Sequence, residues 1–491
     1  MKRQKNIDRG WAWLVMMSSY IGMVIYCVPL YMSGVLYIAL LEKFNKGEAK
    51  TSLIGAVSSG LLCFAAPLGG VINNRFSCRV SIVLGGALTT IGFAASAFVP
   101  SLDWMLVTAG IFVGFGFAIS SSGLICVVGF YFEKWRESVI SCAFLTVGLA
   151  MFISAPFGIH LLAEYGLNTA FLILAGIQAQ MCVCGMISKP SSIEIEVHAQ
   201  KKRDRKVKGE STSKTYLDVT LMKNISYTCY LISISTWNFG LCVAIMHLPN
   251  YVSILGGSNR DIGLLMTSFS VANTIGRLLG SLTISKMSKK CLHVYAGVLG
   301  LTGTLTSLFI FYSDFTGGTY IFAIQLGMFT GWPNSMMTPL SLRFVGVHKL
   351  SEAYGLAYVF CGLGVSTGPV LIGYLYVVTG SYKYSFVVAG VVLCLGCLSG
   401  VCSICCRHDS TTDDRTTEVV VITKDKYVVA KSLQVGDDSS MEYKMTESEN
   451  HFDSYSSQYN YKKEAITNGT CVQQQGLDGE EAYKLLTDEI R

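Results

Sequence analysis

Twelve apolar runs, each long enough to cross a lipid bilayer as a helix, constrain the fold of this chain more than any other feature. Inside a bilayer every backbone N–H and C=O must find a partner within the protein, so the runs are predicted to be helical. The composition agrees, because 51% of the residues are hydrophobic and only 14% are charged. The sequence therefore predicts an all-α membrane protein. The runs lie at about 14–41, 51–72, 80–98, 104–130, 138–160, 169–187, 225–252, 261–285, 292–312, 318–342, 352–379 and 384–406.

Lysine and arginine are distributed unequally between the two sides of the predicted membrane. If the N-terminus is cytosolic, the connections on that side carry 22 of these residues and those on the other side carry 5. Because cytosolic connections are enriched in lysine and arginine, both termini and the long central connection are predicted to be cytosolic. The central connection and the tail are polar enough to be predicted as largely disordered. The predicted parts are a cytosolic N-terminus (1–13), an N-terminal six-helix half (14–187), a cytosolic central loop (188–224), a C-terminal six-helix half (225–406) and a disordered cytosolic tail (407–491).

A short motif occurs once in each half. Gly69, Arg75 and Arg79 follow the second span, and Gly280, Lys286 and Lys290 follow the eighth, each 211 residues later. A glycine allows two helices to cross closely and the cations suit the carboxyl ends of helices, so we expect a structural and gating role. With six spans on either side of a long loop, the repeat predicts the major facilitator fold, in which the substrate site lies between the halves near the midplane.

Arg277 is the only lysine, arginine, aspartate or glutamate well inside any of the twelve spans. An arginine within the bilayer costs from about 3 to more than 10 kcal/mol, so a compensating contact is expected. No carboxylate is predicted at a similar depth, because Glu133, Glu137 and Glu352 all lie near the membrane surface. Either the guanidinium binds a substrate carboxylate or gates the path, or it reaches the interface or backbone carbonyls. The first interpretation is preferred, since the interface is roughly 9 to 12 Å away.

Helical spacing places the neighbours of Arg277 in two stripes. Ala272, Gly276 and Gly280 recur every four residues and are predicted to pack on a neighbouring helix. Asn273, Arg277 and Ser281 form a second stripe, which can face a polar cavity, so Asn273 is a second candidate for substrate contact.

The tenth span contains a further polar candidate. Trp332, Pro333 and Asn334 are predicted to interrupt this span with a kink, because proline removes a helical hydrogen bond. An interrupted helix exposes polar groups to a cavity, so Asn334 is predicted to contact substrate.

Two motifs resemble the signatures of the monocarboxylate transporters. Asp8-Arg9-Gly10-Trp11-Ala12-Trp13 resembles D-G-G-W-G-W at the start of the first span, and Phe130-Tyr131-Phe132-Glu133-Lys134-Trp135-Arg136 resembles Y-F-x-K-R-R before the fifth. Gly276-Arg277 is similar to the place of the family's substrate-gating arginine. The resemblance covers residues 8–406 and identifies the chain as a divergent member of this family. It implies structural or gating roles for the signature residues Asp8, Trp11, Trp13, Lys134 and Arg136.

The resemblance implies a plasma-membrane carrier of small organic monocarboxylates that works by alternating access, in the best-known members as proton symport. Those members pair the arginine with an aspartate one turn earlier, where this chain has Asn273. They also carry a lysine in the first span, where this chain has Tyr31, or Leu30 if aligned on Pro29. An amide cannot titrate, so uptake is expected not to rise with an inward proton gradient, and Tyr31 becomes a substrate-contact candidate. Facilitative carriers of aromatic amino acids, thyronines, carnitine or creatine remain alternatives.

Other functional classes find less support. The chain has no G-x-x-x-x-G-K-[ST] loop for an ATP-driven pump, and nothing predicts an enzyme, a nucleic-acid partner or a cofactor. Its 17 cysteines lack the spacing of a metal site. A transporter-like sensor or scaffold that does not transport remains an alternative of another class. The expected partners are a small organic anion, membrane lipid and, through the resemblance, a single-span accessory glycoprotein.

Overall fold

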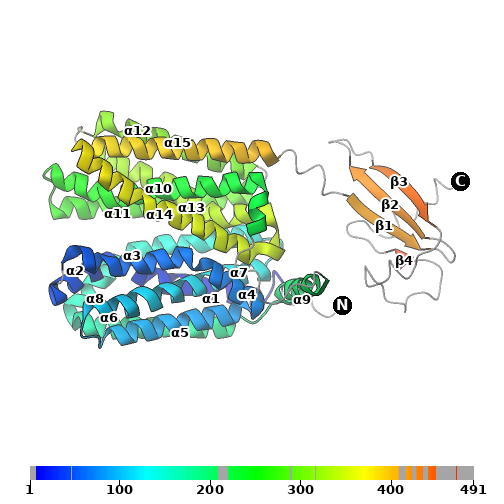
Figure 1. The fold of residues 1–491 in the computed structure, drawn as a ribbon, viewed down its shortest axis with the longest axis horizontal. Coiled ribbons are helices and arrows are strands. Elements are labelled where there is room, and N and C mark those ends of the chain that lie inside the picture. Colours follow the sequence, from blue (N-terminus) through cyan, green and yellow to red (C-terminus); the bar gives the residue numbers. More distant parts are fainter. Residues whose placement is uncertain are drawn as a thin grey trace. The chain divides into compact units, whose positions relative to one another are not determined.

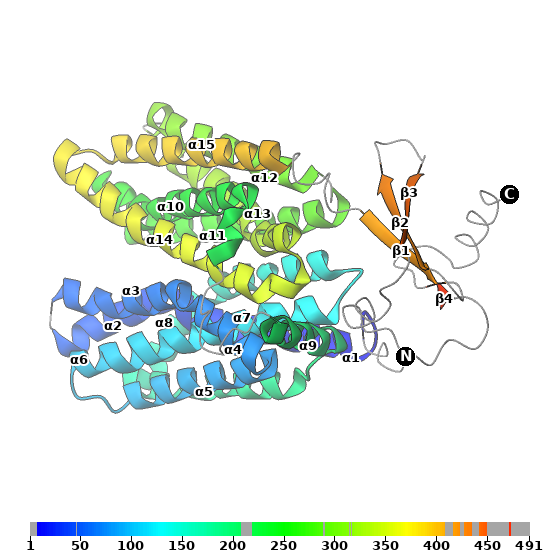
Figure 2. The same cartoon turned by 45° about the vertical axis from the view of Figure 1, so that its right-hand side comes forward.

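The computed structural model describes residues 7–45, 47–207, 219–287, 290–313, 315 and 317–407, and in the tail 416–422, 427–434, 441–448 and 471–472. The chain divides into two units, Met1–Ile404 and Cys405–Arg491. The described part of the first unit contains helices and no strand. These helices form two groups that lie side by side, as the two views in Figure 1 and Figure 2 show.

The first group of helices is the N-terminal half. A π-helical turn, η1, joins α6 to α7, so that Leu102–Tyr131 crosses as one span. The helices are α1 (Trp11–Tyr31), α2 (Ser33–Phe44), α3 (Glu48–Phe64), α4 (Ala66–Arg75), α5 (Cys78–Ser96), α6 (Leu102–Met105), η1 (Leu106–Phe112), α7 (Val113–Tyr131) and α8 (Arg136–Ile187).

The second group is the C-terminal half, and two further helices lie in the connection between the groups. The connection contains α9 (Ser192–Val207) and the 3₁₀ turn η2 (Val219–Lys223). The C-terminal half contains α10 (Ile225–Ile254), α11 (Asn259–Lys286), α12 (Cys291–Tyr312), α13 (Gly318–Val345), the 3₁₀ turn η4 (Val347–Lys349), α14 (Leu350–Thr379) and α15 (Tyr382–Arg407).

The helices account for the twelve predicted spans. Within the described residues nine helices are long and apolar enough to cross a membrane, or ten if the bent pair α3 and α4 is one span. The 52-residue α8 is broken at Gly166, whose φ of 70° and ψ of 171° only glycine adopts readily, so it supplies two spans rather than one. The 28-residue α13 supplies the predicted tenth span. The prediction of an all-α major facilitator fold is confirmed.

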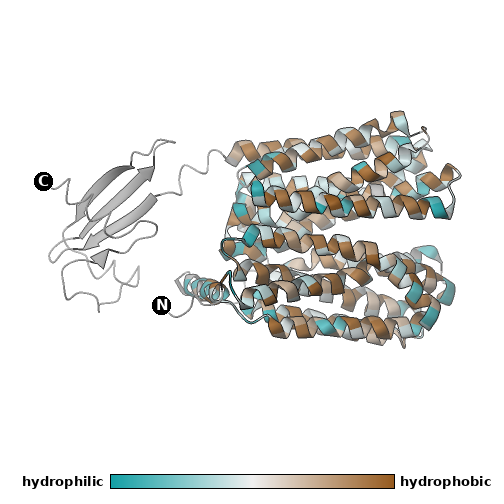
Figure 3. Ribbon diagram, turned by 180° about the vertical axis from the view of Figure 1, so that it is seen from behind, coloured by the Kyte–Doolittle hydropathy of each residue, from teal (hydrophilic) through white to brown (hydrophobic). Residues whose placement is uncertain are grey.

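Hydrophobic residues cover the helices along their length, and hydrophilic residues gather at the helix ends and on α9 (Figure 3). Large apolar side chains on the outside are widely exposed, for example Phe98 at 77%, Phe311 at 82% and Val377 at 80%. Such a surface is stable against lipid tails rather than water. The protein is therefore a multi-pass membrane protein.

The halves meet at one end, formed by residues around 8–11, 131–136, 187–194, 286–287, 290–291 and 343–352, which we call the basic end. One apolar cluster of buried residues continues from the N-terminal half into α14 through Leu350 and Ala353. A Cβ atom at Gly70 of α4 would lie 2.7 Å from the carbonyl oxygen of Ser351, and one at Gly355 of α14 would lie 2.8 Å from Cα of Pro67. The two backbones therefore touch across the boundary between halves.

Part of the central connection is ordered, contrary to the prediction that 188–224 is largely disordered. Residues 192–207 form the helix α9, and Glu194 and Val197 on it are 1% and 0% exposed. The polar composition misled the prediction because a helix needs only one apolar stripe to dock, and α9 has one. Residues 208–218 of the connection lie outside the described part.

The second unit contains an antiparallel sheet in the order β3-β2-β1-β4. Its strands are β1 (Thr416–Ile422), β2 (Tyr427–Gln434), β3 (Met441–Ser448) and β4 (Cys471–Val472). Val419 pairs with Ala430, and Ala430 with Met445. The prediction that 407–491 is disordered is wrong for these strands. Runs of β-branched residues such as Val419–Val421 favour strands. For the rest of the tail, which lies outside the described residues, disorder stays a prediction.

Candidate functional site

Arg277 lies in the middle of α11 and is 2% exposed. Its Nε donates to Oδ1 of Asn273 at 2.8 Å, and its Nη1 donates to the backbone oxygen of Phe144 at 3.2 Å. Phe144 belongs to α8 of the N-terminal half, so Arg277 connects the two halves. Of the second interpretation, the contact with a backbone carbonyl is seen, whereas a side chain that reaches the membrane interface is not.

The charge of Arg277 has no carboxylate partner in the described part of the chain. No Asp or Glu oxygen of the described residues lies within 4.0 Å of its guanidinium nitrogens. Its two hydrogen bonds use two of five N–H donors. Nη2 makes no hydrogen bond to a described residue. This nitrogen is not completely enclosed by the protein. A buried cation with donors to spare is suited to bind an anion.

Asn273 holds Arg277 through the orientation of its amide. Its Nδ2 donates to the backbone oxygen of Gly327 at 3.2 Å and to Oγ1 of Thr330 at 3.3 Å. Both acceptors belong to α13, so Oδ1 is directed at Arg277. The structure thus brings these two predicted candidates together, one helical turn apart.

The stripe of small residues on α11 packs against α13, as predicted. A Cβ atom at Gly276 would collide with the backbone oxygen of Met328, and one at Gly280 with that of Trp332. Ser335 Oγ on α13 donates to the backbone oxygen of Arg277 at 3.0 Å. Close backbone packing therefore fixes α11 on α13, and Arg277 reaches from α11 to Phe144 of the N-terminal half.

Tyrosines from both halves interact electrostatically with the arginine. Tyr31 of α1 interacts electrostatically with Arg277, so this third candidate is also at the site. Tyr26 of α1 and Tyr358 of α14 interact with it as well, and they are 3% and 9% exposed. The ring of Tyr358 lies 4.4 Å from that of Tyr354. Sequence reasoning missed these rings because, among 25 tyrosines, no spacing shows which ones face inward.

Asn334 is placed differently from the other candidates. The predicted interruption at Trp332–Asn334 is wrong, because α13 stays helical from Gly318 to Val345 with Pro333 and Pro339 inside it. A helix tolerates proline when neighbouring helices satisfy the backbone groups that it leaves unpaired. The Asn334 amide forms no hydrogen bond to a described residue and is partly exposed. Its contact with substrate stays a prediction.

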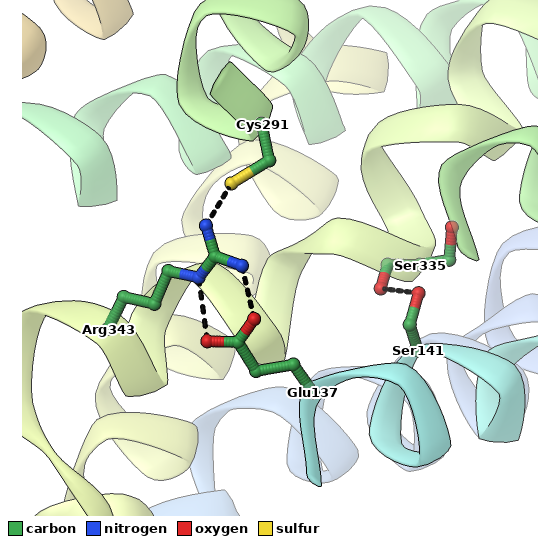
Figure 4. Close-up of polar contacts among 5 residues, drawn as sticks. All are labelled: Glu137, Ser141, Cys291, Ser335 and Arg343. Carbon is green, nitrogen blue, oxygen red and sulfur yellow. Dashed lines mark hydrogen bonds and ion pairs between the residues drawn. The ribbon is translucent and has the colours of Figure 1, made fainter. Parts of the chain in front are cut away.

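An ion pair joins the halves at the basic end (Figure 4). Arg343, in the last turn of α13, donates through Nε and Nη2 to the two carboxylate oxygens of Glu137 in the first turn of α8. Arg343 Nη1 also lies 2.5 Å from Sγ of Cys291. The fork geometry is that of a strong charge-assisted pair. Sequence alone assigns Glu137 no role, because its partner lies 206 residues away.

A serine cluster continues the junction toward Arg277. Ser141 Oγ, on α8, donates to the backbone oxygen of Ser335 at 2.8 Å (Figure 4) and lies 3.2 Å from Oγ of Ser281. The described hydrogen bonds and ion pairs between the halves therefore extend from the basic end to the level of Arg277.

The two signature motifs contact each other. Asp8 accepts hydrogen bonds from the backbone N–H groups of Glu133 and Lys134, at 3.2 and 3.1 Å. Arg136 Nε donates to the backbone oxygens of Gly129 and Phe132, both at 2.7 Å. These bonds satisfy backbone groups at the helix ends.

The signature tryptophans and Lys134 lie beside this junction. Trp11 Nε1 donates to the backbone oxygen of Ile187 at 3.2 Å, and the Trp13 ring lies 5.4 Å from Phe132. Lys134 Nζ lies over the Trp135 ring at 5.5 Å. The geometry is that of a structural junction.

In the repeated loop motif the glycines pack against neighbouring helices, whereas the cations lie at the surface. A Cβ atom at Gly69 would lie 2.7 Å from Cβ of Ser122 on α7, so this glycine allows the close crossing that was predicted. Arg75 lies over the Phe76 ring at 5.7 Å. The remaining cations of the motif are exposed: Arg79, Lys286 and Lys290. Their gating role stays a prediction.

Comparison with known proteins identifies the family. The profile described as Major Facilitator Superfamily matches residues 13–258 and 227–420. The chain belongs to the major facilitator superfamily. It is a secondary transporter by family and not an enzyme, as the sequence predicts.

The resemblance to monocarboxylate transporters is confirmed as a distant similarity. Monocarboxylate transporter 12 of Xenopus laevis is 26% identical over 403 residues, which cover 78% of this chain and 86% of that protein. Monocarboxylate transporter 4 of Gallus gallus is 27% identical over 396 residues, covering 79% and 81%.

Among solved structures, the E. coli fucose:proton symporter FucP has a TM-score of 0.65 at 14% identity, covering 80% of this chain and 99% of that one. A second crystal structure, of FucP in the outward conformation, has a TM-score of 0.62. At this identity the likeness shows the shared fold.

Proposed function

We propose that the protein carries a small organic monocarboxylate across the plasma membrane by alternating access, with both termini and the basic end in the cytosol. Arg277 is the contact for the substrate carboxylate in this proposal, and Asn273 orients it. One observation carries the proposal: a buried arginine, 2% exposed, has no carboxylate partner among the described residues. The unequal distribution of lysine and arginine supports the orientation.

The contact between Arg277 and Phe144 supports a coupling between binding and movement of the halves. A substrate carboxylate that takes up the Nη donors replaces the Phe144 oxygen, which Nη1 now contacts at 3.2 Å. Loss of this bond, together with those of Ser141 to Ser281 and Ser335, releases α11 and α13 from α8. The contacts between the halves, which extend from the basic end to Arg277, support a state closed toward the cytosol in this proposal.

Transport without proton coupling is part of the proposal. Oδ1 of Asn273 occupies the place beside Arg277 that a titratable carboxylate would need, at 2.8 Å from Nε. An amide neither gains nor loses a proton near neutral pH. An inward proton gradient should therefore not stimulate uptake.

A second candidate is a carrier of aromatic amino acids or related aromatic carboxylates. The electrostatic interaction of Tyr26, Tyr31 and Tyr358 with Arg277 favours it, because a tyrosine ring near the carboxylate contact can pair with an aromatic ring of the ligand. Ligands of this class would present a carboxylate to Arg277 and a ring to the tyrosines.

The test is uptake of radiolabelled solutes by a cell line that lacks endogenous carriers. The panel contains lactate, pyruvate, ketone bodies, aromatic amino acids, thyronines, carnitine and creatine. Arg277→Ala should lower uptake efficiency by about 100-fold, since two charge-assisted hydrogen bonds contribute about 3 kcal/mol together. Arg260→Ala is the matched control, because it removes an exposed cation from the same helix. This variant should retain uptake.

Undiminished uptake by Arg277→Ala would contradict the role of this residue. If no organic anion enters cells that display the parent protein at their surface, the transport proposal fails and a sensor or scaffold is favoured.

A further inference from the structure

The connection between the halves carries a helix that docks on one half and reaches the other. Ser191 Oγ donates to the backbone oxygen of Phe130 at 2.9 Å and accepts from the N–H of Glu194 at 3.1 Å, which caps α9. Tyr131 Oη donates to the backbone oxygen of Lys189 at 2.7 Å. The start of α9 is thus held by the end of α7.

Glu194 attaches α9 to a second helix of the N-terminal half. Its Oε1 accepts from the backbone N–H of Cys78 at 2.8 Å, at the first residue of α5. The positive end of the helix dipole and this hydrogen bond stabilise the carboxylate. Val197, one turn further along, is 0% exposed and continues the docked face.

Lys201 continues the same face and contacts both halves at once. It follows Glu194 by two helical turns, so that the two side chains point the same way. Its Nζ donates to Oδ1 of Asn74 in α4 and to Oε1 of Glu352 in α14, both at 2.8 Å. Asn74 belongs to the N-terminal half and Glu352 to the C-terminal half. The pair is well shielded, since the Lys201 and Glu352 side chains are 19% and 20% exposed.

The place of Glu352 explains why this contact matters for movement. Glu352 lies in the first turn of α14, directly after Ser351, whose backbone oxygen is where α14 meets Gly70 of α4. Its second oxygen, Oε2, is enclosed and has no hydrogen-bond partner among the described residues. Separation of the halves at the basic end would leave this partly buried carboxylate without its only described cation.

We propose that α9 is a latch, a helix that holds the basic end closed. Lys201 joins the halves in this latch through its contacts with Asn74 and Glu352. The latch stabilises the closed state relative to the state in which the halves separate at this end, and so biases the alternation on which the proposed function rests. A covalent or electrostatic change at Lys201 would shift that balance without touching the arginine site.

Disulfide formation across the basic end reports the equilibrium between the closed state and the state in which the halves separate there. Ser351 Oγ lies 3.4 Å from Sγ of Cys126, on α14 and α7, so Ser351→Cys places a thiol beside a native one. Ser141→Cys with Ser281→Cys is a second reporter deeper in the junction, where the hydroxyls lie 3.2 Å apart. Copper phenanthroline supplies the oxidant, and a protease site within residues 208–218 lets a gel separate linked from unlinked halves.

Lys201→Ala should lower the initial rate of disulfide formation in both reporters by about two- to fivefold, the size expected for a partly exposed ion pair. Lys202→Ala removes an exposed lysine from the same helix and should leave the rate unchanged. Lys201→Glu should lower the rate further, and addition of Glu352→Lys should restore it. If charge reversal impairs folding, Glu352→Gln is the milder variant: it removes the negative charge but keeps the shape, and it should lower the rate of disulfide formation as Lys201→Ala does.

Equal rates for Lys201→Ala and Lys202→Ala in both reporters would overturn the proposal. So would a loss that the charge exchange does not restore, because Lys201 would then act without Glu352. Neither reporter requires a substrate, so uptake by the parent protein, measured separately, distinguishes failure of the latch from failure of the transport function.

Discussion

Asn273→Asp is the substitution that tests the arginine site most directly. Oδ1 of Asn273 lies 2.8 Å from Nε of Arg277, so the new carboxylate forms an ion pair without a change of shape. With about 4 Å between the charge centres and an effective dielectric constant of about 20, the attraction is about 4 kcal/mol. Burial of the carboxylate opposes this, and its second oxygen faces the backbone oxygen of Gly327, which now accepts from Nδ2 at 3.2 Å.

A net stabilisation of about 1.4 kcal/mol in the empty carrier would weaken binding of a substrate anion about tenfold, because both carboxylates compete for Arg277. Protonation of the new aspartate removes the competitor. Uptake by the variant should therefore be weak at about pH 7.4 and rise with an inward proton gradient, whereas uptake by the parent should not respond.

The assay is initial uptake of the identified substrate into sealed vesicles, with about pH 7.4 inside and either about pH 7.4 or about pH 6 outside. Asn238→Asp is the control, because Asn238 is also buried, at 4% exposed, but its amide bonds to the backbone oxygen of Ile234 and to Sγ of Cys361 rather than to Arg277. If Asn273→Asp has the affinity and pH response of the parent, the competition between carboxylates for Arg277 is refuted.

Three further substitutions test the packing. Burial raises the pKa of Glu194 above its ordinary value of 4.5; its stabilising contribution is therefore fully present below the unfolded pKa and is lost as pH rises through the folded pKa. Glu194→Gln should flatten that part of the profile of melting temperature against pH, and an unchanged profile would contradict the assignment. Asp8→Ala removes an acceptor for the N–H of Lys134 and should destabilise by about 1 kcal/mol, seen as a lower melting temperature in detergent. Gly276→Ala should cost about 1–3 kcal/mol by collision with the carbonyl of α13, while Gly263→Ala, which meets nothing within 4 Å, should cost little; equal melting temperatures for the two would contradict the tight packing.

Part of the arginine site could be predicted from the sequence because of helical periodicity. Residues one turn apart share a face, so Asn273 and Arg277 had to be neighbours, and the glycine stripe beside them had to pack. The tyrosines could not be found in this way. Tyr26 and Tyr358 lie on different helices of different halves, and apolar helices give no periodic signal for the inward face.

The latch and the ion pair at the basic end were outside the reach of sequence reasoning. Glu137 and Arg343 are 206 residues apart, and Lys201 and Glu352 are 151 apart. Net polarity made the segment that contains Lys201 resemble a solvated linker, whereas one buried stripe was enough to dock it.

The sequence by itself determined the membrane-spanning helices, the division into two halves and the buried arginine, because the bilayer allows few structures to a chain with twelve long apolar runs. Only the tertiary structure decided what Arg277 contacts, which tyrosines interact with it electrostatically and which charges join the halves. Those contacts depend on the rotation and spacing of helices that meet far from each other in the chain, and these are set by side-chain packing rather than by any local pattern.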